Sequence, residues 1–335
     1  MKPQAAEPGW VERRAQGMGT VMTHRAFGRH ADEALERVLA CAAQLEASMS
    51  RFVPSSDISA INSAAGRGCP VRVGGSTMRV LARALELSRT ARGLFDVTIG
   101  PLVDLWRVTQ REGSSDCSIP DDDGIRACLS LVDYRDLLLD AAAGPAPDVG
   151  TAALARAGQS IDLGGIAKGY AADTFAEIFR SMSITSAFTN IGGNVMAVGG
   201  KPDGSPWRVG IEHPREDGRL VGALQVTDAS VVTSGDYQRF FIDQAGVRRS
   251  HILDPRTGRP ARSGLISATV VAPCSMDADA LSTMVFVAGI EAGRECASSH
   301  DIYGMVLVDE DLTVWVSNES RLHFTAASGL TVRTM

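Results

Sequence analysis

Short runs of β-forming residues follow one another through the second half of the chain, and they restrict its fold more than any other feature. Each run is rich in apolar and β-branched residues, and glycine, proline or polar residues separate it from the next. One helix is predicted among them, over residues 277–288. We therefore expect an α+β fold with prominent antiparallel sheet in its C-terminal half. The predicted strands are 187–189, 195–198, 207–211, 224–226, 231–233, 265–271, 305–308 and 313–316.

The N-terminal third is instead rich in predicted helix. Apolar residues at helical spacing follow Asp32, a candidate N-cap, and predict an amphipathic helix over 32–49. A second helix is predicted over 76–91, and Pro101 suits the first turn of a third.

The expected domain organisation is simple. Residues 1–17 are expected to be an N-terminal tail. Residues 18–335 are expected to form one domain, with the helix-rich part packed on a largely antiparallel β core. Polar stretches rich in glycine and proline between residues 111 and 150 mark a candidate seam between two packed subdomains.

Composition excludes several classes of protein. The 335 residues, 44% of them hydrophobic, can bury a sizeable core. A formal net charge of −6 argues against a nucleic-acid surface. There is no apolar run of roughly eighteen residues, the length that spans a membrane, and no signal-like N-terminal segment. The six cysteines include no Cys-x-x-Cys pair. We expect a cytoplasmic protein with reduced cysteines, no membrane insertion and no nucleic-acid partner.

Residues 162–169, Asp-Leu-Gly-Gly-Ile-Ala-Lys-Gly, are the most informative local motif. They join a short apolar strand to a helical run through Gly164 and Gly165, which let the backbone approach a ligand closely. A helix starting near Ile166 would direct unpaired N–H groups at that ligand, and Lys168 would add a full positive charge. The motif predicts a phosphate or dinucleotide site. An ordinary turn between strand and helix is the alternative.

A second candidate site lies on the predicted helix 277–288. Asp279 and Thr283 are four residues apart on one helical face, so a carboxylate and a hydroxyl oxygen can converge on one point. Oxygen ligands suit Mg²⁺, whose coordination substrate phosphates usually complete. Alternatively, the pair is only a solvated helix face after a cap formed by Asp277 or Ser275.

His251 belongs to a third motif, in which residues 233–237 precede His-Ile-Leu-Asp-Pro-Arg-Thr-Gly at 251–258. The turn formed by the second segment would place His251 at the rim of the sheet, where a base that titrates near neutral pH can face a cleft. Alternatively, His251 is a surface or satisfied core residue and Asp254 simply forms the turn.

Further motifs accompany these three in a fixed order. They are Met18-Gly19-Thr20, Arg51-Phe52-x-Pro54-x-Ser56-x-Ile58-Ser59-x-x-Asn62, and Gly93-Leu94-Phe95-Asp96-x-Thr98-x-Gly100-Pro101-Leu102-Val103. Together, from residue 18 to about residue 290, the motifs resemble the ApbE-like flavin transferases, the FAD:protein FMN transferases. The ordered set is far more specific than any one motif.

The resemblance implies an ApbE-like fold and a magnesium-dependent reaction, with Mn²⁺ as the alternative metal. FAD, the substrate, is split at its pyrophosphate, FMN is joined through a phosphoester to a threonine of an acceptor protein, and AMP leaves. It implies metal ligands from Asp279, Thr283 and the Gly165 carbonyl, and catalytic roles for Asp279, Lys168 and His251, the last as base for the threonine hydroxyl. The implied FAD contacts are Met18, Phe52, Leu94, Phe95, Asp96, Asp162, Lys168, His251 and Leu253.

The sequence departs from the family pattern in two ways. Some relatives carry a hydrogen-bonding Tyr or Asn at the position of Phe52. Many are exported lipoproteins, whereas this chain begins without a signal sequence or lipobox cysteine, which implies an acceptor in the cytoplasm or on the cytoplasmic membrane face. Residues 190–194 either approach the ligand or form a plain hairpin turn. Two other functions stay open: a magnesium-dependent FAD pyrophosphatase, in which water replaces threonine, and a non-catalytic FAD-binding protein.

Overall fold

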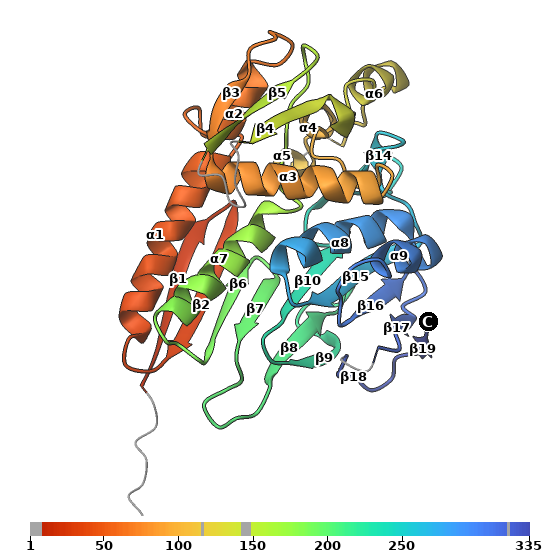
Figure 1. The fold of residues 1–335 in the computed structure, drawn as a ribbon. Coiled ribbons are helices and arrows are strands. Elements are labelled where there is room, and N and C mark those ends of the chain that lie inside the picture. Colours follow the sequence, from red (N-terminus) through yellow and green to blue (C-terminus); the bar gives the residue numbers. More distant parts are fainter. Residues whose placement is uncertain (1–8, 115–116, 142–148, 320–321) are drawn as a thin grey trace, which may run out of the picture.

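A nine-stranded sheet runs through the middle of the molecule (Figure 1). The computed structural model describes residues 9–114, 117–141, 149–319 and 322–335. The strand order is β1-β2-β6-β7-β10-β15-β16-β17-β19, and neighbours pair antiparallel except β17 and β19, which are parallel. The bounds are Trp10–Gly17 (β1), Thr20–Phe27 (β2), Ala187–Ile191 (β6), Asn194–Val198 (β7), Ser230–Gly235 (β10), Leu265–Ala272 (β15), Gly304–Asp309 (β16), Val314–Val316 (β17) and Val332–Thr334 (β19).

Smaller sheets surround this central one. A three-stranded sheet has the order β18-β9-β8, another has the order β3-β5-β4, and β11-β12 and β13-β14 are two-stranded pairs. Their bounds are Val71–Gly74 (β3), Leu137–Ala141 (β4), Val149–Leu154 (β5), Trp207–Glu212 (β8), Leu220–Val226 (β9), Phe240–Ile242 (β11), Arg248–Ser250 (β12), Leu253–Asp254 (β13), Arg259–Pro260 (β14) and Phe324–Ala326 (β18).

Helices α1, α7 and α8 cover one face of the central sheet (Figure 1). None of the helices within the described ranges is both long and apolar enough to span a membrane. The helix bounds are Ala31–Met49 (α1), Asp57–Ser63 (α2), Gly75–Thr90 (α3), Gly100–Trp106 (α4), Val108–Arg111 (α5), Asp122–Leu129 (α6), Tyr134–Asp136 (η1, a 3₁₀ turn), Ala167–Ser181 (α7), Ser275–Ala288 (α8) and Ile290–Ala297 (α9).

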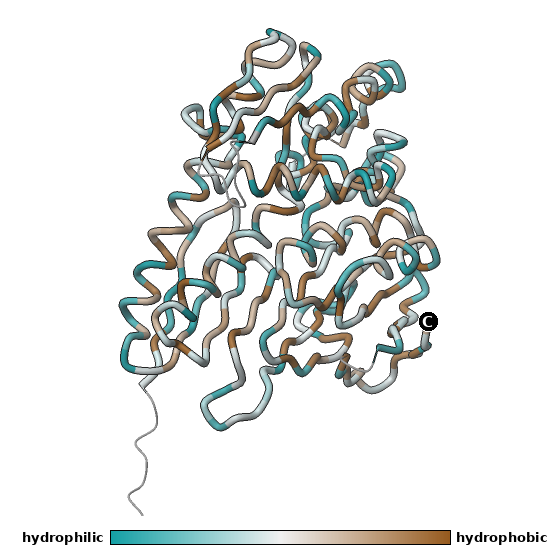
Figure 2. Tube along the Cα trace, viewed as in Figure 1, coloured by the Kyte–Doolittle hydropathy of each residue, from teal (hydrophilic) through white to brown (hydrophobic). Residues whose placement is uncertain are grey.

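Two hydrophobic cores lie on opposite faces of the central sheet. Because side chains alternate along a strand, Val232 and Val270 join the core beneath the helices, whereas Val231 and Val271 join the core beneath the β18-β9-β8 sheet. Figure 2 shows hydrophobic residues concentrated in these central strands and hydrophilic residues in the outer loops, such as the one between β7 and β8. The molecule is therefore layered, with helices on one face and a small sheet on the other.

The structure confirms the predicted α+β class. The predicted helices correspond to α1, α3, α4 and α8, and each predicted C-terminal strand lies in β6 to β10 or β15 to β17. Two expectations are corrected. Residues 10–17, expected in a tail, form β1 and pair with β2 along its whole length. Asp32 lies in the first turn of α1, which His30 precedes at the N-cap position. Residues 1–8 of the expected tail, and residues 115–116 and 142–148 of the candidate seam, lie outside the described residues.

Candidate nucleotide and metal site

Helices α7 and α8 approach each other closely at Gly169. A Cβ added at this position would lie 2.3 Å from the carbonyl oxygen of Ser275 and 2.6 Å from Cα of Met276. The start of α8 is fixed by α7 as well, because the carboxylate of Asp173 accepts hydrogen bonds from the backbone N–H groups of Ser275 and Met276, both at 2.8 Å. Asp173, on α7, therefore caps α8. The capping that the sequence assigned to Asp277 or Ser275 is not observed, and Asp277 instead pairs with Arg83 at 2.7 Å.

The close approach holds Asp279 in a buried position. Asp279 is 3% exposed, and its Oδ2 accepts a hydrogen bond from the backbone N–H of Gly169 at 2.9 Å. Its Oδ1 lies 3.5 Å from the ammonium of Lys168. A buried carboxylate is costly unless it is paired, and here the N-terminal turn of α7 supplies both partners. The N–H groups that were expected to face a ligand thus include one that binds Asp279.

Thr283 and Gly165 lie together beside this carboxylate. A Cβ at Gly165 would be 3.5 Å from Oγ1 of Thr283 and 3.1 Å from the ring of Phe95, so a side chain here would require a small shift of that ring. The Thr283 hydroxyl also lies 3.3 Å from Oγ of Ser234, at the end of β10. The structure therefore brings Gly165, Thr283 and Asp279 to one place, as the spacing and the family pattern predicted.

Lys168 and Asp162 stabilise the turn that precedes α7. The Lys168 ammonium donates to the Gly164 carbonyl at 2.6 Å. Asp162 Oδ1 accepts from the Gly164 N–H at 2.8 Å, and its Oδ2 accepts from Nη1 of Arg51 at 3.0 Å. Arg51 is also bound to the more exposed Asp104. Asp162, a predicted FAD contact, therefore shapes the turn in addition to any contact with a ligand.

His251 lies close enough to this turn for the charges of Lys168 and Asp162 to act on it. Its Nδ1 lies 3.1 Å from the carbonyl oxygen of Arg239. Since a carbonyl only accepts, Nδ1 must carry the proton and Nε2 must carry the lone pair. The pKa of His251 is lowered to about 4, chiefly by burial and also by the positive charges of Arg239 and Lys168, while the hydrogen bond to the Arg239 backbone and the charge of Asp162 oppose this shift. His251 is thus neutral near pH 7 and offers Nε2 as a proton acceptor.

The turn between β1 and β2 borders the same region. Met18 and Gly19 both have positive φ, 53° and 71°, as a tight hairpin turn requires, and the Gly19 carbonyl accepts from Arg239. Gly192 and Gly193 have positive φ as well and close the β6–β7 hairpin. A Cβ at Gly192 would lie 2.4 Å from Oγ1 of Thr20. The 190–194 segment is therefore a hairpin turn, and it packs beside the turn that carries Met18.

The other predicted FAD contacts differ in their surroundings. Phe52 is 78% exposed. Leu94 packs at the edge of the main core, and Leu253 is buried in a small cluster with residues of α4. Asp96 is buried, and its two oxygens accept from Thr98 and from the backbone N–H of Tyr134. Burial raises the pKa of Asp96. Asp96 therefore shapes the segment after Phe95, in addition to any contact with a ligand.

Sequence reasoning missed Arg51, Ser234 and Arg239 as members of the site. Arg51 and Ser234 stood inside quoted motifs without an assigned role, so a charged or hydroxyl side chain within a motif was the available signal. Arg239 had no local signal, because its contact with Gly19 spans 220 positions in the sequence.

The donor set fits a hard divalent cation. No cluster of three or more His, Cys, Asp or Glu side chains suited to a metal occurs in the described part of the chain. A buried carboxylate, a hydroxyl and a backbone carbonyl of the glycine turn are oxygen donors of the kind that Mg²⁺ binds together with substrate phosphates. A cationic group, the Lys168 ammonium, already lies between Asp279 and the turn. Asp279, Thr283 and Gly165 could therefore hold such an ion.

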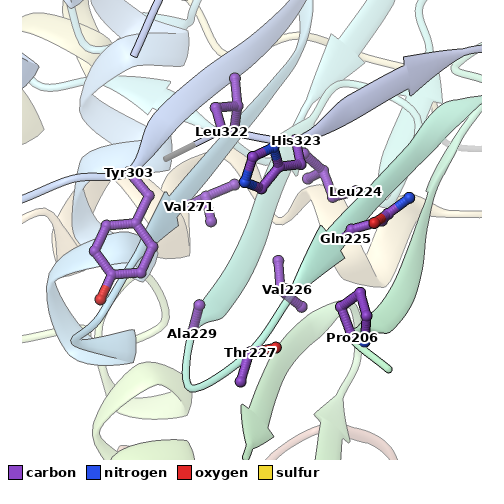
Figure 3. A pocket seen from close by; sticks show the side chains of 10 residues that line it. All are labelled: Pro206, Leu224, Gln225, Val226, Thr227, Ala229, Val271, Tyr303, Leu322 and His323. Carbon is purple, nitrogen blue, oxygen red and sulfur yellow. The ribbon is translucent and has the colours of Figure 1, made fainter. Parts of the chain in front are cut away.

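A separate cavity lies on the opposite side of the central sheet. Its volume is 550 Å³, and Figure 3 shows its lining side chains between β9, β15 and the segment before β18. None of the predicted site residues lines it. The lining residues are Pro206, Leu224, Gln225, Val226, Thr227, Ala229, Val271, Tyr303, Leu322 and His323.

Oxygen donors, an adjacent ammonium and a neutral histidine are features expected of an enzyme site for a phosphate-bearing nucleotide. Comparison with known proteins is more specific: residues 18–306 match the ApbE family, and the chain belongs to that family. It is 36% identical over 302 residues to a FAD:protein FMN transferase of Treponema pallidum, covering 86% of this chain and 81% of the relative. A Klebsiella pneumoniae FAD:protein FMN transferase is also 36% identical and covers 80% of each chain.

Solved structures agree with this assignment. The ApbE protein of Thermotoga maritima superposes with a TM-score of 0.80 at 29% identity, covering 91% of this chain and 96% of the other. The flavin transferase ApbE of Vibrio cholerae gives a TM-score of 0.77 at 28% identity, covering 96% of this chain and 98% of the other. The ApbE-like fold expected from the motifs is therefore confirmed.

Proposed function

We propose that this protein is a magnesium-dependent FAD:protein FMN transferase that modifies a threonine of an acceptor protein. One observation supports this most strongly. The backbone N–H of Gly169, on α7, binds the buried carboxylate of Asp279, and that carboxylate lies one helical turn from the Thr283 hydroxyl. Gly165, in the turn before α7, lies next to that hydroxyl. This arrangement suits the pyrophosphate of FAD rather than its flavin ring.

Each residue of the site has a separate role in the proposed reaction. Asp279, Thr283 and the Gly165 carbonyl would hold Mg²⁺, which neutralises charge on the pyrophosphate when bound. Lys168 offers a further positive charge next to that site. Nε2 of His251 accepts the proton of the threonine hydroxyl. The threonine oxygen then forms a bond to the phosphorus of the FMN half, the bond from that phosphorus to the bridging oxygen breaks, and AMP leaves with the electron pair.

The electrostatics suit His251 as the base. In the ligand-free protein its pKa is lowered to about 4, so it is unprotonated at neutral pH. A bound pyrophosphate brings negative charge, which favours the protonated form and raises the pKa toward the working pH. The basicity of His251 would then increase when the substrate is in place.

Asp279→Asn tests the assignment, with Asp277→Asn as the matched control on the same helix. Asparagine keeps an acceptor for the Gly169 N–H but removes the charge. We expect Asp279→Asn to lower kcat at least ~100-fold, to weaken Mn²⁺ binding measured by electron paramagnetic resonance, and to leave FAD affinity within about threefold. Asp277→Asn, which loses only its ion pair with Arg83, should keep wild-type activity. Full activity in Asp279→Asn would refute the metal assignment.

The products distinguish the two possible reactions. The wild-type protein is incubated with FAD, Mg²⁺ and candidate threonine-bearing acceptor proteins, and flavin fluorescence on the denatured acceptor is measured together with AMP. Labelled acceptor and AMP in equal amounts support the transferase. AMP with free FMN and no labelled acceptor would instead support the pyrophosphatase. We further propose that the acceptor is met in the cytoplasm or at the cytoplasmic membrane face, which fractionation of the source cells would test.

A further inference from the structure

Arg239 links two parts of the site that are far apart in the sequence. Its Nη2 donates a hydrogen bond to the Gly19 carbonyl at 2.7 Å, across 220 positions. Its own backbone carbonyl accepts from the backbone N–H of His251 at 3.1 Å and lies 3.1 Å from Nδ1 of the same residue. Gly19 directly follows Met18 in the β1–β2 turn. One residue therefore contacts both the turn with a proposed FAD contact and the proposed base.

The segment that carries Arg239 is fixed on both sides. Before it, Asp236 accepts two hydrogen bonds from Arg215, at 2.7 and 2.8 Å. After it, β11 pairs with β12, and β12 ends directly before His251. Any displacement of Arg239 is therefore transmitted to His251 through the β11–β12 hairpin and through the shared hydrogen bonds.

The side chain at this position has to be a long donor. The β1–β2 turn presents a carbonyl oxygen, and a guanidinium forms a charge-assisted hydrogen bond with it, which is about twice as strong as a neutral one. No ion pair within the described residues involves Arg239, so its charge is not neutralised by a neighbouring carboxylate. A lysine could supply the charge but not the planar fork that fixes direction.

We propose that Arg239 is a positioning residue of the transferase reaction. Its side chain holds the Met18–Gly19 turn, and its backbone holds the Nδ1–H form of His251, so the FAD contact and the base keep a fixed spacing. Arg239 does not act on the reacting atoms. The inference rests on the proposed function, because it assigns Met18 and His251 their roles.

The first experiment compares Arg239→Met, Arg239→Lys and the control Arg208→Met, an exposed arginine on β8. FAD binding is measured by quenching of FAD fluorescence without acceptor, and kcat is measured with acceptor. We expect Arg239→Met to raise the Kd for FAD on the order of 10-fold and to lower kcat by a smaller factor, as loss of one charge-assisted hydrogen bond predicts. Arg239→Lys should recover part of the affinity, and Arg208→Met should match the wild type. FAD affinity of Arg239→Met within twofold of the wild type would overturn the proposal.

The second measurement does not depend on catalysis. In ¹⁵N-histidine-labelled protein without ligand, the His251 signals, assigned with His251→Gln, report which ring nitrogen carries the proton. We expect the Nδ1–H form in the wild type, in Arg208→Met and in Arg239→Met, because the substitution keeps the backbone carbonyl that accepts from Nδ1 and the β11–β12 pairing that holds it. The Nε2–H form in the wild type would overturn the proposal even if the protein transfers FMN. If the wild type fails to transfer FMN, the function fails, yet this measurement still decides the role of Arg239. Should Arg239→Met not fold in a urea titration, Arg239→Lys carries both tests.

Discussion

Gly169→Ala is the substitution that tests the architecture of the site most directly. The added methyl group would lie 2.3 Å from the Ser275 carbonyl oxygen and 2.6 Å from Met276 Cα. These are backbone atoms, which cannot turn aside as a side chain can. Ordinary van der Waals contacts of a Cβ are 3.4–4 Å long, so α7 and α8 must separate by roughly 1 Å. Overpacking of this kind costs about 1–3 kcal/mol of folding free energy.

The same separation would disturb the proposed metal site. The hydrogen bond from the Gly169 N–H to Asp279 is 2.9 Å long, and a shift near 1 Å would break it and leave a buried carboxylate with fewer partners. A misplacement of about 1 Å in an active site can cost ~100-fold in rate. We therefore expect kcat/KM for FMN transfer to fall by that order. The control is Gly9→Ala, because nothing lies within 4 Å of a Cβ at Gly9.

The assays are urea unfolding and steady-state transfer of FMN to the acceptor. We expect Gly169→Ala to lose both folding free energy and FMN-transfer activity, and Gly9→Ala to lose neither. Activity within twofold of the wild type, in a protein destabilised as predicted, would show that the α7–α8 spacing does not set the geometry of Asp279. Unchanged stability would show that the helices separate without cost, and the packing argument would then be wrong.

Two further predictions concern stability. Burial lowers the pKa of His24 from 6.5 to about 4. As the pH falls, His24 is therefore protonated in the unfolded chain before it is protonated in the folded protein. This difference should reduce the free energy of unfolding by about 3 kcal/mol between pH 6.5 and 4. Urea titrations of His24→Phe should lack that share of the pH dependence, and those of the exposed His30→Gln should retain it. In a double-mutant cycle, Arg51→Met and Asp162→Asn should couple by about 1–2 kcal/mol, whereas Arg51→Met and the exposed Asp104→Asn should couple by under about 0.5 kcal/mol. Equal coupling of the two pairs would contradict the structural role given to the Arg51–Asp162 contact.

Local patterns predicted the elements that bury a regular apolar face. The bounds of α8 and β15 follow from continuous apolar runs, and the four-residue spacing of Asp279 and Thr283 was enough to predict that both side chains share one face of α8. The β1–β2 hairpin was missed for a physical reason. β1 is an edge strand rich in charged residues, and charges protect an edge from further pairing while hiding its strand pattern. The proposed seam within residues 111–150 stays a prediction.

Contacts between distant segments could not be read from any local pattern. Arg51 meets Asp162 across 111 positions, and Arg239 meets Gly19 across 220. Each contact depends on how the sheet brings loops to one end, and spacing along the chain carries no information about that. The family resemblance proposed the residues of the site, but it did not name the residues that hold them in place.

The role of Gly169 shows why such partners matter for function. The motif at 162–169 pointed to Gly164 and Gly165 as the glycines that let a ligand approach. The last glycine of the motif serves a different purpose, since it lets one helix approach another closely enough for a backbone N–H to reach Asp279. A backbone donor has no rotamers to lose, and it cannot be protonated or displaced by a change of side chain. The hydrogen bond from Gly169 fixes Oδ2 of Asp279. The other carboxylate oxygen, Oδ1, lies 3.5 Å from the Lys168 ammonium and can bind a further cation. Gly169 therefore positions the protein's own acid, and the proposed metal site depends on it as well as on Gly165.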